Sequence, residues 1–191
     1  AWCIHLGGVF LGGGAVGKAA GDAKVARNLL EEPWDFVFFT GSGKVGQIVS
    51  EVLSSRLIPH VLELGGKNPV IIGPGGVTAT LVRRLVWAKF INCGQTCIAP
   101  DDVLVPEKDA EKLIELLTAQ LNNFYGADPA QSTDYGRIGH YRHFDRLVQM
   151  LESSLACSCP ATDLSEGVPR IWAGGQYDRT SLYFAPTLIT G

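Results

Sequence analysis

Two chemically reactive side chains, a carboxylate and a thiol, stand near the middle of the 191-residue sequence, each close to glycines. Glu63 lies in a short apolar segment that ends at Gly65-Gly66, and Cys97 closes the segment Gly94-Gln95-Thr96-Cys97. A thiol that ionises becomes a strong nucleophile, and a nearby carboxylate can accept a proton from that thiol or from an attacking water. The two residue types therefore indicate covalent catalysis, provided that the fold brings them together.

Each of these residues also has an ordinary structural explanation. Leu62 and Leu64 point away from Glu63 in an extended segment, so Glu63 could simply occupy the polar face of a strand. Cysteine without a partner is usually a small buried hydrophobe, which is what we expect for Cys93 and which remains open for Cys97. A zinc site is disfavoured because Cys93 and Cys97 lack two further ligands at a matching spacing; the remaining close pair is Cys157 and Cys159.

Composition narrows the class of protein. With 46% hydrophobic and 18% charged residues, the chain resembles an ordinary globular protein, and its net charge of −3 argues against nucleic acid or an anionic membrane as the main partner. No apolar run is long enough to span a bilayer. Five cysteines do not form a complete disulfide framework, so we expect a reducing, intracellular (cytoplasmic) compartment. The N-terminus has no basic region, so no signal peptide is expected, and the missing initial Met predicts that the sequence begins within a longer protein.

Helical and strand periodicities alternate along the chain and predict an α/β fold with a largely parallel sheet. Residues 34–40 read as a buried strand, followed by a glycine-rich turn at 41–46 and a helix that Ser42 caps. Further strands are expected at 60–64, 69–72, 103–105, 171–175 and 182–189. Helices are expected at 78–92, 107–125 and 143–155. The Gly/Pro cluster at 73–76 is the candidate domain boundary.

The first 32 residues are rich in glycine and are expected to form an entry loop. Two phosphate-binding patterns can nevertheless be matched there. Gly12, Gly14 and Gly17 fit a dinucleotide fingerprint, and Gly12 to Lys18 nearly fits a P-loop, although Ala19 replaces the hydroxyl residue that binds magnesium. A P-loop nucleotide-binding protein is therefore an alternative. The turn at 41–46 contains a second Gly-x-Gly-x-x-Gly pattern, for which a plain tight turn is an equal explanation.

Three ordered segments resemble motifs of the NAD(P)-dependent aldehyde dehydrogenases, in particular their class 3, fatty-aldehyde-like branch. Residues 62–69 (Leu-Glu-Leu-Gly-Gly-Lys-Asn-Pro) resemble the glutamate motif of that family. Residues 90–101 (Phe-Ile-Asn-Cys-Gly-Gln-Thr-Cys-Ile-Ala-Pro-Asp) resemble its cysteine motif, and residues 39–46 resemble its cofactor turn. The resemblance runs from about residue 34 to 190 and covers residues 1–32 only loosely.

This resemblance implies an aldehyde dehydrogenase-like fold, in which the end of a Rossmann-type cofactor domain (residues 1–72) precedes most of an α/β catalytic domain (residues 73–191). It implies that Cys97 attacks an aldehyde to form a thiohemiacetal, that hydride transfer to NAD or NADP leaves a thioester, and that Glu63 is the general base. The backbone N–H of Cys97 would bind the oxyanion. The residues implied to contact the cofactor are Gly41, Ser42, Val45 and Gly46 at the pyrophosphate and Leu64 and Gly65 near the nicotinamide. The implied parent enzyme is a homodimer that acts on a small-molecule aldehyde, and membrane association of that parent stays open.

The sequence also departs from the family pattern. Family members are more than twice as long, and residues 1–32 match neither the Asn that completes the oxyanion hole nor the Lys at the cofactor ribose. The sequence ends before the Glu-x-Phe-Gly-Pro segment, and Asp102 stands where an aromatic residue is expected. We therefore expect a fragment with little or no turnover of its own, and an inactive remnant of such an enzyme is the second alternative.

Overall fold

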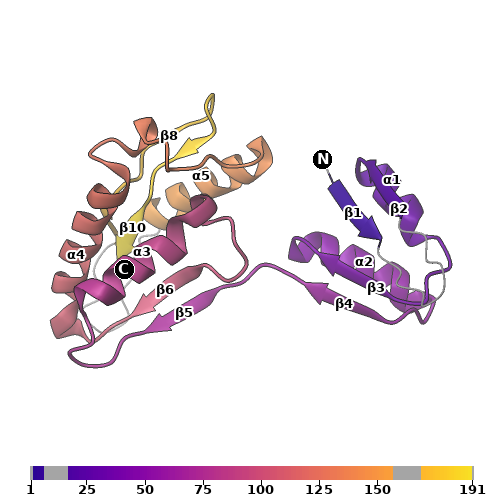
Figure 1. Ribbon diagram of the computed structural model, residues 1–191, viewed down its shortest axis with the longest axis horizontal. Coiled ribbons are helices and arrows are strands. Elements are labelled where there is room, and N and C mark those ends of the chain that lie inside the picture. The colour runs from indigo at the N-terminus through magenta and orange to yellow at the C-terminus, as the bar shows by residue number, and fades with distance from the viewer. Residues whose placement is uncertain (1, 7–16, 157–168, 191) are drawn as a thin grey trace. The chain divides into compact units, whose positions relative to one another are not determined.

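The computed structural model describes residues 2–6, 17–156 and 169–190, and it consists of two compact units, Ala1–Gly65 and Gly66–Gly191 (Figure 1). Strands and helices alternate through most of both units, so the α/β prediction is confirmed. The assignment of residues 1–72 to a cofactor domain and of 73–191 to a catalytic domain stays a prediction.

The described part of the first unit contains two separate pairs of strands. β1 (Trp2–Leu6) and β2 (Gly17–Gly21) pair antiparallel, and α1 (Ala23–Leu30) follows. β3 (Val37–Thr40) and β4 (His60–Glu63) pair in parallel, and α2 (Gly43–Ser55) connects them, as a parallel pair requires. The buried residues Val49, Leu53 and Ile58 form the core of this strand–helix–strand unit.

The expectation of an entry loop over residues 1–32 is wrong for the residues that the structure describes. Asp22 begins α1, because its carboxylate accepts hydrogen bonds from the N–H groups of Lys24 (2.9 Å) and Val25 (3.2 Å). An Asp before a helical stretch is a sequence signal that the glycine count concealed. The P-loop alternative also fails locally, since Gly17 and Lys18 lie in β2 rather than at the start of a helix; Gly12 and Gly14 lie outside the described residues.

The second unit begins with a parallel pair, β5 (Asn68–Ile71) and β6 (Pro100–Leu104), connected by α3 (Ala79–Phe90) and a short 3₁₀ turn, η1 (Ile91–Gly94). α4 (Glu107–Tyr125) packs against α3, and Figure 1 shows both helices beside this strand pair. The bounds of α4 match the predicted helix 107–125. The core is built from one side of each helix and from residues of the C-terminal segments; its members include Val82, Val86, Leu113, Leu117, Leu121, Tyr135 and Tyr183.

The remaining elements are one further helix and several short turns and strands. The 3₁₀ turn η2 (Pro129–Gln131) precedes α5 (Tyr141–Ala156). β7 (Arg170–Ala173) pairs antiparallel with β10 (Leu188–Thr190), and β8 (Tyr177–Asp178) pairs antiparallel with β9 (Tyr183–Phe184).

The prediction of a largely parallel sheet is therefore wrong for the described part of the chain, where two strand pairs are parallel and three are antiparallel. The physical reason is the connection: the C-terminal strands follow one another through turns, without the helical crossover that parallel neighbours need. Within the same described residues, no helix is both long and apolar enough to cross a membrane.

Candidate active site

Cys97 lies in a tight turn between η1 and β6, and its side chain is exposed. The turn is closed by a hydrogen bond from the N–H of Ala99 to the carbonyl oxygen of Thr96 (3.1 Å). Pro100 then begins β6 directly. The predicted nucleophile is thus accessible, at the end of the strand pair where β5 and β6 both start, and it is not a buried hydrophobe.

The backbone reverses sharply just before this turn. Asn92 (φ 53°), Cys93 (φ 56°) and Gly94 (φ 76°) are three successive residues in the left-handed region. Glycine adopts this conformation freely and Asn tolerates it, but a cysteine there is strained. The strain has to be compensated by contacts around the loop, and Gln95 makes several of them.

The Gln95 side chain ties the cysteine loop to a second segment of the same unit, residues 135–139. Its Nε2 donates to the carbonyl oxygens of Asn92 and Arg137 (both 3.0 Å), and its Oε1 accepts from the N–H of Gly139 (2.8 Å). In return, the Asn92 side chain donates to the Gln95 carbonyl (3.2 Å). Both polar atoms of the Gln95 carboxamide are therefore occupied.

The segment to which Gln95 binds is itself firmly held. The Arg137 guanidinium donates to the carbonyl oxygens of Ala130 (2.6 Å), Tyr135 and Gly136 (both 3.1 Å), and its carbon lies 5.1 Å from the centre of the Tyr183 ring. The Tyr135 hydroxyl donates to the Phe184 carbonyl (2.9 Å). Gln95 thus anchors the cysteine loop to a part of the core that is cross-linked by several hydrogen bonds.

On its other side, the cysteine turn contacts the second half of the glutamate motif. The Asn68 side-chain Nδ2 donates to the carbonyl oxygens of Cys97 (2.8 Å) and Ala99 (3.0 Å). Gly66 lies so close that a Cβ there would collide with the Cys97 carbonyl oxygen and would come within 2.7 Å of Asn68 Nδ2. Two motifs recognised separately in the sequence are therefore in direct contact.

The charges next to this contact are compensated. Asp101 forms ion pairs with Lys67 (2.9 Å) and Lys89 (3.0 Å). Burial alone would raise the pKa of Asp101, but the hydrogen bonds and charges of the two lysines outweigh it, and the pKa is lowered. Asp102, where the family resemblance predicted an aromatic residue, is exposed on β6 beside Pro69.

Cys93, the other thiol of the loop, differs from Cys97 in its surroundings. It is half-buried, and burial raises the pKa of its thiol more than the hydrogen bond with Tyr135 and the charge of Arg137 lower it. A thiol held in its protonated form is a poor nucleophile. Of the two, Cys97 is therefore the better candidate for chemistry.

The predicted cofactor turn is a compact group within the first unit. The N–H of Gly41 donates to the Glu63 carbonyl (3.0 Å), which places the ends of β3 and β4 side by side. The Ser42 hydroxyl accepts from the N–H of Val45 (3.4 Å) and caps α2. The side chain of Leu64 fills the space beside Gly46, where a Cβ would lie 2.6 Å from Leu64 Cδ2. These positions adjoin the carboxyl ends of two parallel strands, which is where α/β folds bind ligands.

The remaining positions of this turn are more open. A Cβ at Gly43 or at Gly65 would meet nothing within 4 Å. The Gly43 that completes the Gly-x-Gly-x-x-Gly pattern is thus not required by packing. Val45 contacts the unit core with its side chain, and its N–H donates to the Ser42 hydroxyl.

Glu63 is exposed at the end of β4, on the face opposite to Leu62, as strand periodicity predicts. It belongs to the first unit and Cys97 to the second. Their cooperation as base and nucleophile stays a prediction. In the described part of the chain, no group of three or more His, Cys, Asp or Glu residues is arranged to hold a metal ion, and Cys157 and Cys159 lie outside it.

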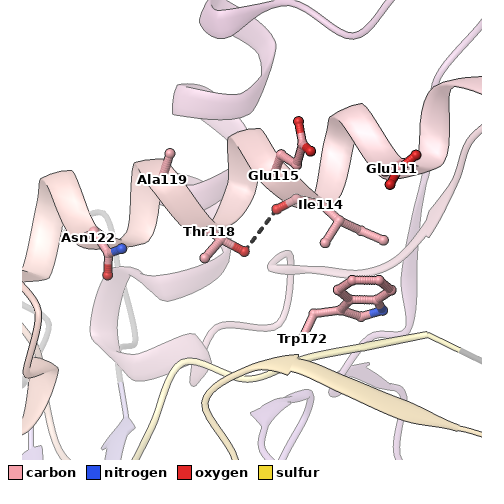
Figure 2. Close-up of a pocket in the computed structure, with 7 residues that line it drawn as sticks. All are labelled: Glu111, Ile114, Glu115, Thr118, Ala119, Asn122 and Trp172. Atoms are coloured by element: carbon pink, nitrogen blue, oxygen red, sulfur yellow. Dashed lines mark hydrogen bonds between the residues drawn. The ribbon is translucent and has the colours of Figure 1, made fainter.

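A shallow hollow on the second unit lies between one face of α4 and Trp172 (Figure 2). Its lining includes Glu111, Glu115 and Asn122 but neither Cys93 nor Cys97. The one hydrogen bond between its lining residues, from Thr118 Oγ1 to the Ile114 carbonyl (2.9 Å), lies within α4. It contains none of the residues that the sequence singled out, so it is not the candidate active site.

Comparison with known proteins identifies relatives of the chain. Residues 14–191 match the family described as "Aldehyde dehydrogenase family". The chain is 41% identical over 170 residues to a 4,4'-diapolycopene-4,4'-dial dehydrogenase of Cytobacillus firmus, covering 89% of this chain and 34% of that protein. It is 37% identical over 169 residues to the mouse aldehyde dehydrogenase family 3 member B2 (88% and 32%) and 38% identical over 161 residues to the mouse "Aldehyde dehydrogenase, dimeric NADP-preferring" (84% and 32%).

Among solved structures, the substrate-bound state of Staphylococcus aureus AldH aligns with a TM-score of 0.76 at 38% identity, covering 87% of this chain and 34% of that one. The chain thus spans about a third of the length of the proteins that it matches. The resemblance to class 3 enzymes is confirmed by the family 3 relatives.

Proposed function

The chain belongs to the aldehyde dehydrogenase family, and from this premise we propose that Cys97 is the nucleophile of an NAD(P)-dependent oxidation of an aldehyde to a carboxylic acid. The observation that carries the proposal is the exposed thiol of Cys97 in a turn to which both family motifs contribute, the cysteine motif by its sequence and the glutamate motif through Asn68. Because the chain covers about a third of its relatives, the full reaction is proposed for the complete enzyme and the nucleophilic reactivity of Cys97 for this chain.

In the proposed reaction, the Cys97 thiolate adds to the aldehyde carbonyl carbon and forms a thiohemiacetal, whose oxyanion accepts a hydrogen bond from the Cys97 N–H. Oxidation at this carbon leaves a thioester on Cys97, which water then cleaves to the acid. Glu63 is the proposed base that takes the proton from the thiol or from that water. Its exposure at the end of β4 leaves the carboxylate free for this role.

The chemistry of the turn at residues 41–46 fits an anionic cofactor. The free N–H groups at a helix start attract phosphate oxygens, and the glycines at 41 and 43 place no side chain over the backbone there. We propose that Gly41, Ser42, Val45 and Gly46 hold the pyrophosphate of NAD or NADP and that Leu64 and Gly65 lie near the nicotinamide. When bound, the cofactor supplies the hydride acceptor.

The further proposals are a homodimeric parent enzyme, a cofactor domain that ends near residue 72, and a reducing compartment, which a thiolate nucleophile needs.

The test is protection of Cys97 by an aldehyde. The chain is incubated with a saturated fatty aldehyde and then briefly with iodoacetamide, and alkylation of each cysteine is quantified by peptide mass spectrometry. Cys97 is expected to be alkylated faster than Cys93 without the aldehyde and to be slowed by it, while Cys93 is unaffected. Equal rates at both thiols, or no protection, would overturn the proposal and favour an inactive remnant.

A second measurement addresses the complete reaction. NAD(P)H formation from the same aldehyde is followed by absorbance, with Cys97→Ser and Glu63→Gln as matched variants. For this chain we expect at most slow formation, abolished in Cys97→Ser. Robust formation that survives Cys97→Ser would assign the chemistry to another residue.

A further inference from the structure

We propose that the side chains of Asn68 and Gln95 are positioning residues for Cys97, and that they hold the backbone on the two sides of the thiol. This inference rests on the proposed function in so far as Cys97 is the nucleophile. The hydrogen bonds that carry it, however, can be tested without any aldehyde chemistry.

Asn68 holds the chain after Cys97. Its Nδ2 group donates both of its hydrogens, to the carbonyl oxygens of Cys97 (2.8 Å) and Ala99 (3.0 Å), which closes the turn from outside. β5 supplies the rigid base for this contact, because Asn68 is its first residue and pairs with Pro100 at the start of β6. Movement of the Cys97 carbonyl would break a hydrogen bond to a side chain that is itself fixed in a sheet.

Gln95 holds the chain before Cys97. Its carboxamide donates to one carbonyl on its own loop, that of Asn92, and to one on the segment 135–139, that of Arg137. Its oxygen accepts from Gly139 on that same segment. The contact of Cys93 with Tyr135 also joins the loop to this segment, but it lies farther along the chain from Cys97. Gln95 therefore makes the anchoring bonds that are nearest to the nucleophile on this side.

The side chains of Asn68 and Gln95 hold the peptide groups that set the position of the Cys97 thiol. The Thr96–Cys97 peptide carries the N–H proposed to bind the oxyanion, and it lies between Gln95 and the Cys97 carbonyl that Asn68 holds. A catalytic group misplaced by a small distance loses much of its rate advantage, so fixing this peptide matters more than its contribution to stability. Neither side chain is itself expected to touch the aldehyde.

The test compares Asn68→Ala, Asn68→Asp, Gln95→Ala and Gln95→Glu. Asn68→Asp keeps the size but places carboxylate oxygens against two carbonyl oxygens, so we expect it to be at least as disruptive as Asn68→Ala. Gln95→Glu keeps the acceptor for Gly139 but places a carboxylate oxygen against the carbonyl oxygens of Asn92 and Arg137, so we expect it, like Asn68→Asp, to be at least as disruptive as the corresponding Ala variant. Thr78→Ala, which removes the cap of α3 in the same unit, is the control for a general loss of stability.

The first readout is spectroscopic. Labelling cysteine carbonyls with ¹³C and isoleucine amides with ¹⁵N gives resonances for the two Cys-Ile peptides, Cys97–Ile98 and Cys3–Ile4. In both Asn68 variants the carbonyl resonance of Cys97 is expected to shift as its hydrogen bond is lost. The Cys3 resonance is the internal reference, and Thr78→Ala is expected to move neither.

The second readout is amide hydrogen exchange. Two hydrogen bonds of ordinary strength correspond to about thirtyfold faster exchange of the Ala99 N–H, which donates to the Thr96 carbonyl, in Asn68→Ala, with exchange in α4 unchanged. An unchanged Cys97 resonance together with unchanged exchange would overturn the inference. If these shifts occur but the aldehyde does not protect Cys97 in the unmodified chain, the positioning role of Asn68 and Gln95 is supported and the proposed function fails.

Discussion

Gly66→Ala tests the contact between the two motifs directly. A methyl group at this position would collide with the Cys97 carbonyl oxygen and would lie 2.7 Å from Asn68 Nδ2 and 3.1 Å from Asn68 Oδ1. Neither neighbour is a flexible side-chain end: one is backbone, and the other is held by two hydrogen bonds. The clash can therefore be relieved only by moving the turn away from β5.

The expected cost follows from what that movement breaks. Losing the two Asn68 hydrogen bonds costs about 1–3 kcal/mol, at about 0.5–1.5 kcal/mol each. Inserting a methyl group into an occupied space costs about 1–3 kcal/mol, but relief of the clash by breaking the bonds makes the two costs overlap rather than add. We expect a loss of about 2–3 kcal/mol in the free energy of unfolding of the second unit.

Gly65 and Gly73 are the matched control positions. A Cβ at Gly65 or Gly73 would meet nothing within 4 Å, and neither has a positive φ, so Ala there is expected to be neutral or to stabilise by up to about 1 kcal/mol. Urea unfolding would be followed by hydrogen exchange of α3 and α4 peptides, which report on the second unit alone. Gly66→Ala with the stability of Gly65→Ala would refute the reasoning, because the observed contact would then cost nothing to disrupt.

Three further predictions follow from single contacts. Burial raises the pKa of the Cys93 thiol, so at alkaline pH the folded state keeps a proton that the unfolded chain loses. The free energy of unfolding should therefore fall as the pH rises above about 8.5. Urea titrations at several pH values should show a weaker fall with pH for Cys93→Ser. Thr78→Ala should lower stability by about 1 kcal/mol, and Ser42→Ala should lower it by less. The reason is that the cap bond from the Leu81 N–H to Thr78 is 3.2 Å long, whereas the cap bond from the Val45 N–H to Ser42 is 3.4 Å long. Equal losses of stability in thermal unfolding would contradict this order. Tyr135→Phe, which removes the hydrogen bond to the Phe184 carbonyl, should cost about 1 kcal/mol in chemical denaturation, and no loss would mean that this bond does not secure residues 135–139.

Local patterns predicted the helices well, because each helix follows from side chains within a few residues of one another. The apolar stripe of residues 107–125 gave the bounds of α4, and Ser42 caps α2 as its position before the helix indicates. Glycine content was misleading in residues 17–30, where Asp22 and the residues after it form a capped helix. The number of glycines indicates how flexible a segment is, but a cap residue and an apolar helical stripe determine whether that segment forms a helix.

Long-range pairing could not be read in this way. Nothing local distinguishes β7, which pairs antiparallel with β10, from a strand of a parallel sheet. The three left-handed residues before Cys97 were also hidden, because only Gly94 among them signals a positive φ. The bonds of Gln95 to residues 137 and 139 join parts of the chain more than forty positions apart, and they depend on how Arg137 holds its own segment.

The structure changes how the glutamate motif itself is understood. In the sequence it looked like one element that delivers a carboxylate. In the structure it divides between Gly65 and Gly66, where the two compact units meet along the chain. Leu64 packs against Gly46 of the candidate cofactor turn, while Gly66 and Asn68 contact the turn of Cys97. A Cβ at Gly46 would lie 2.6 Å from Leu64 Cδ2, and a Cβ at Gly66 would collide with the Cys97 carbonyl oxygen. The two glycines of the motif therefore differ: packing around Cys97 demands a glycine at position 66, whereas a Cβ at Gly65 would meet nothing within 4 Å.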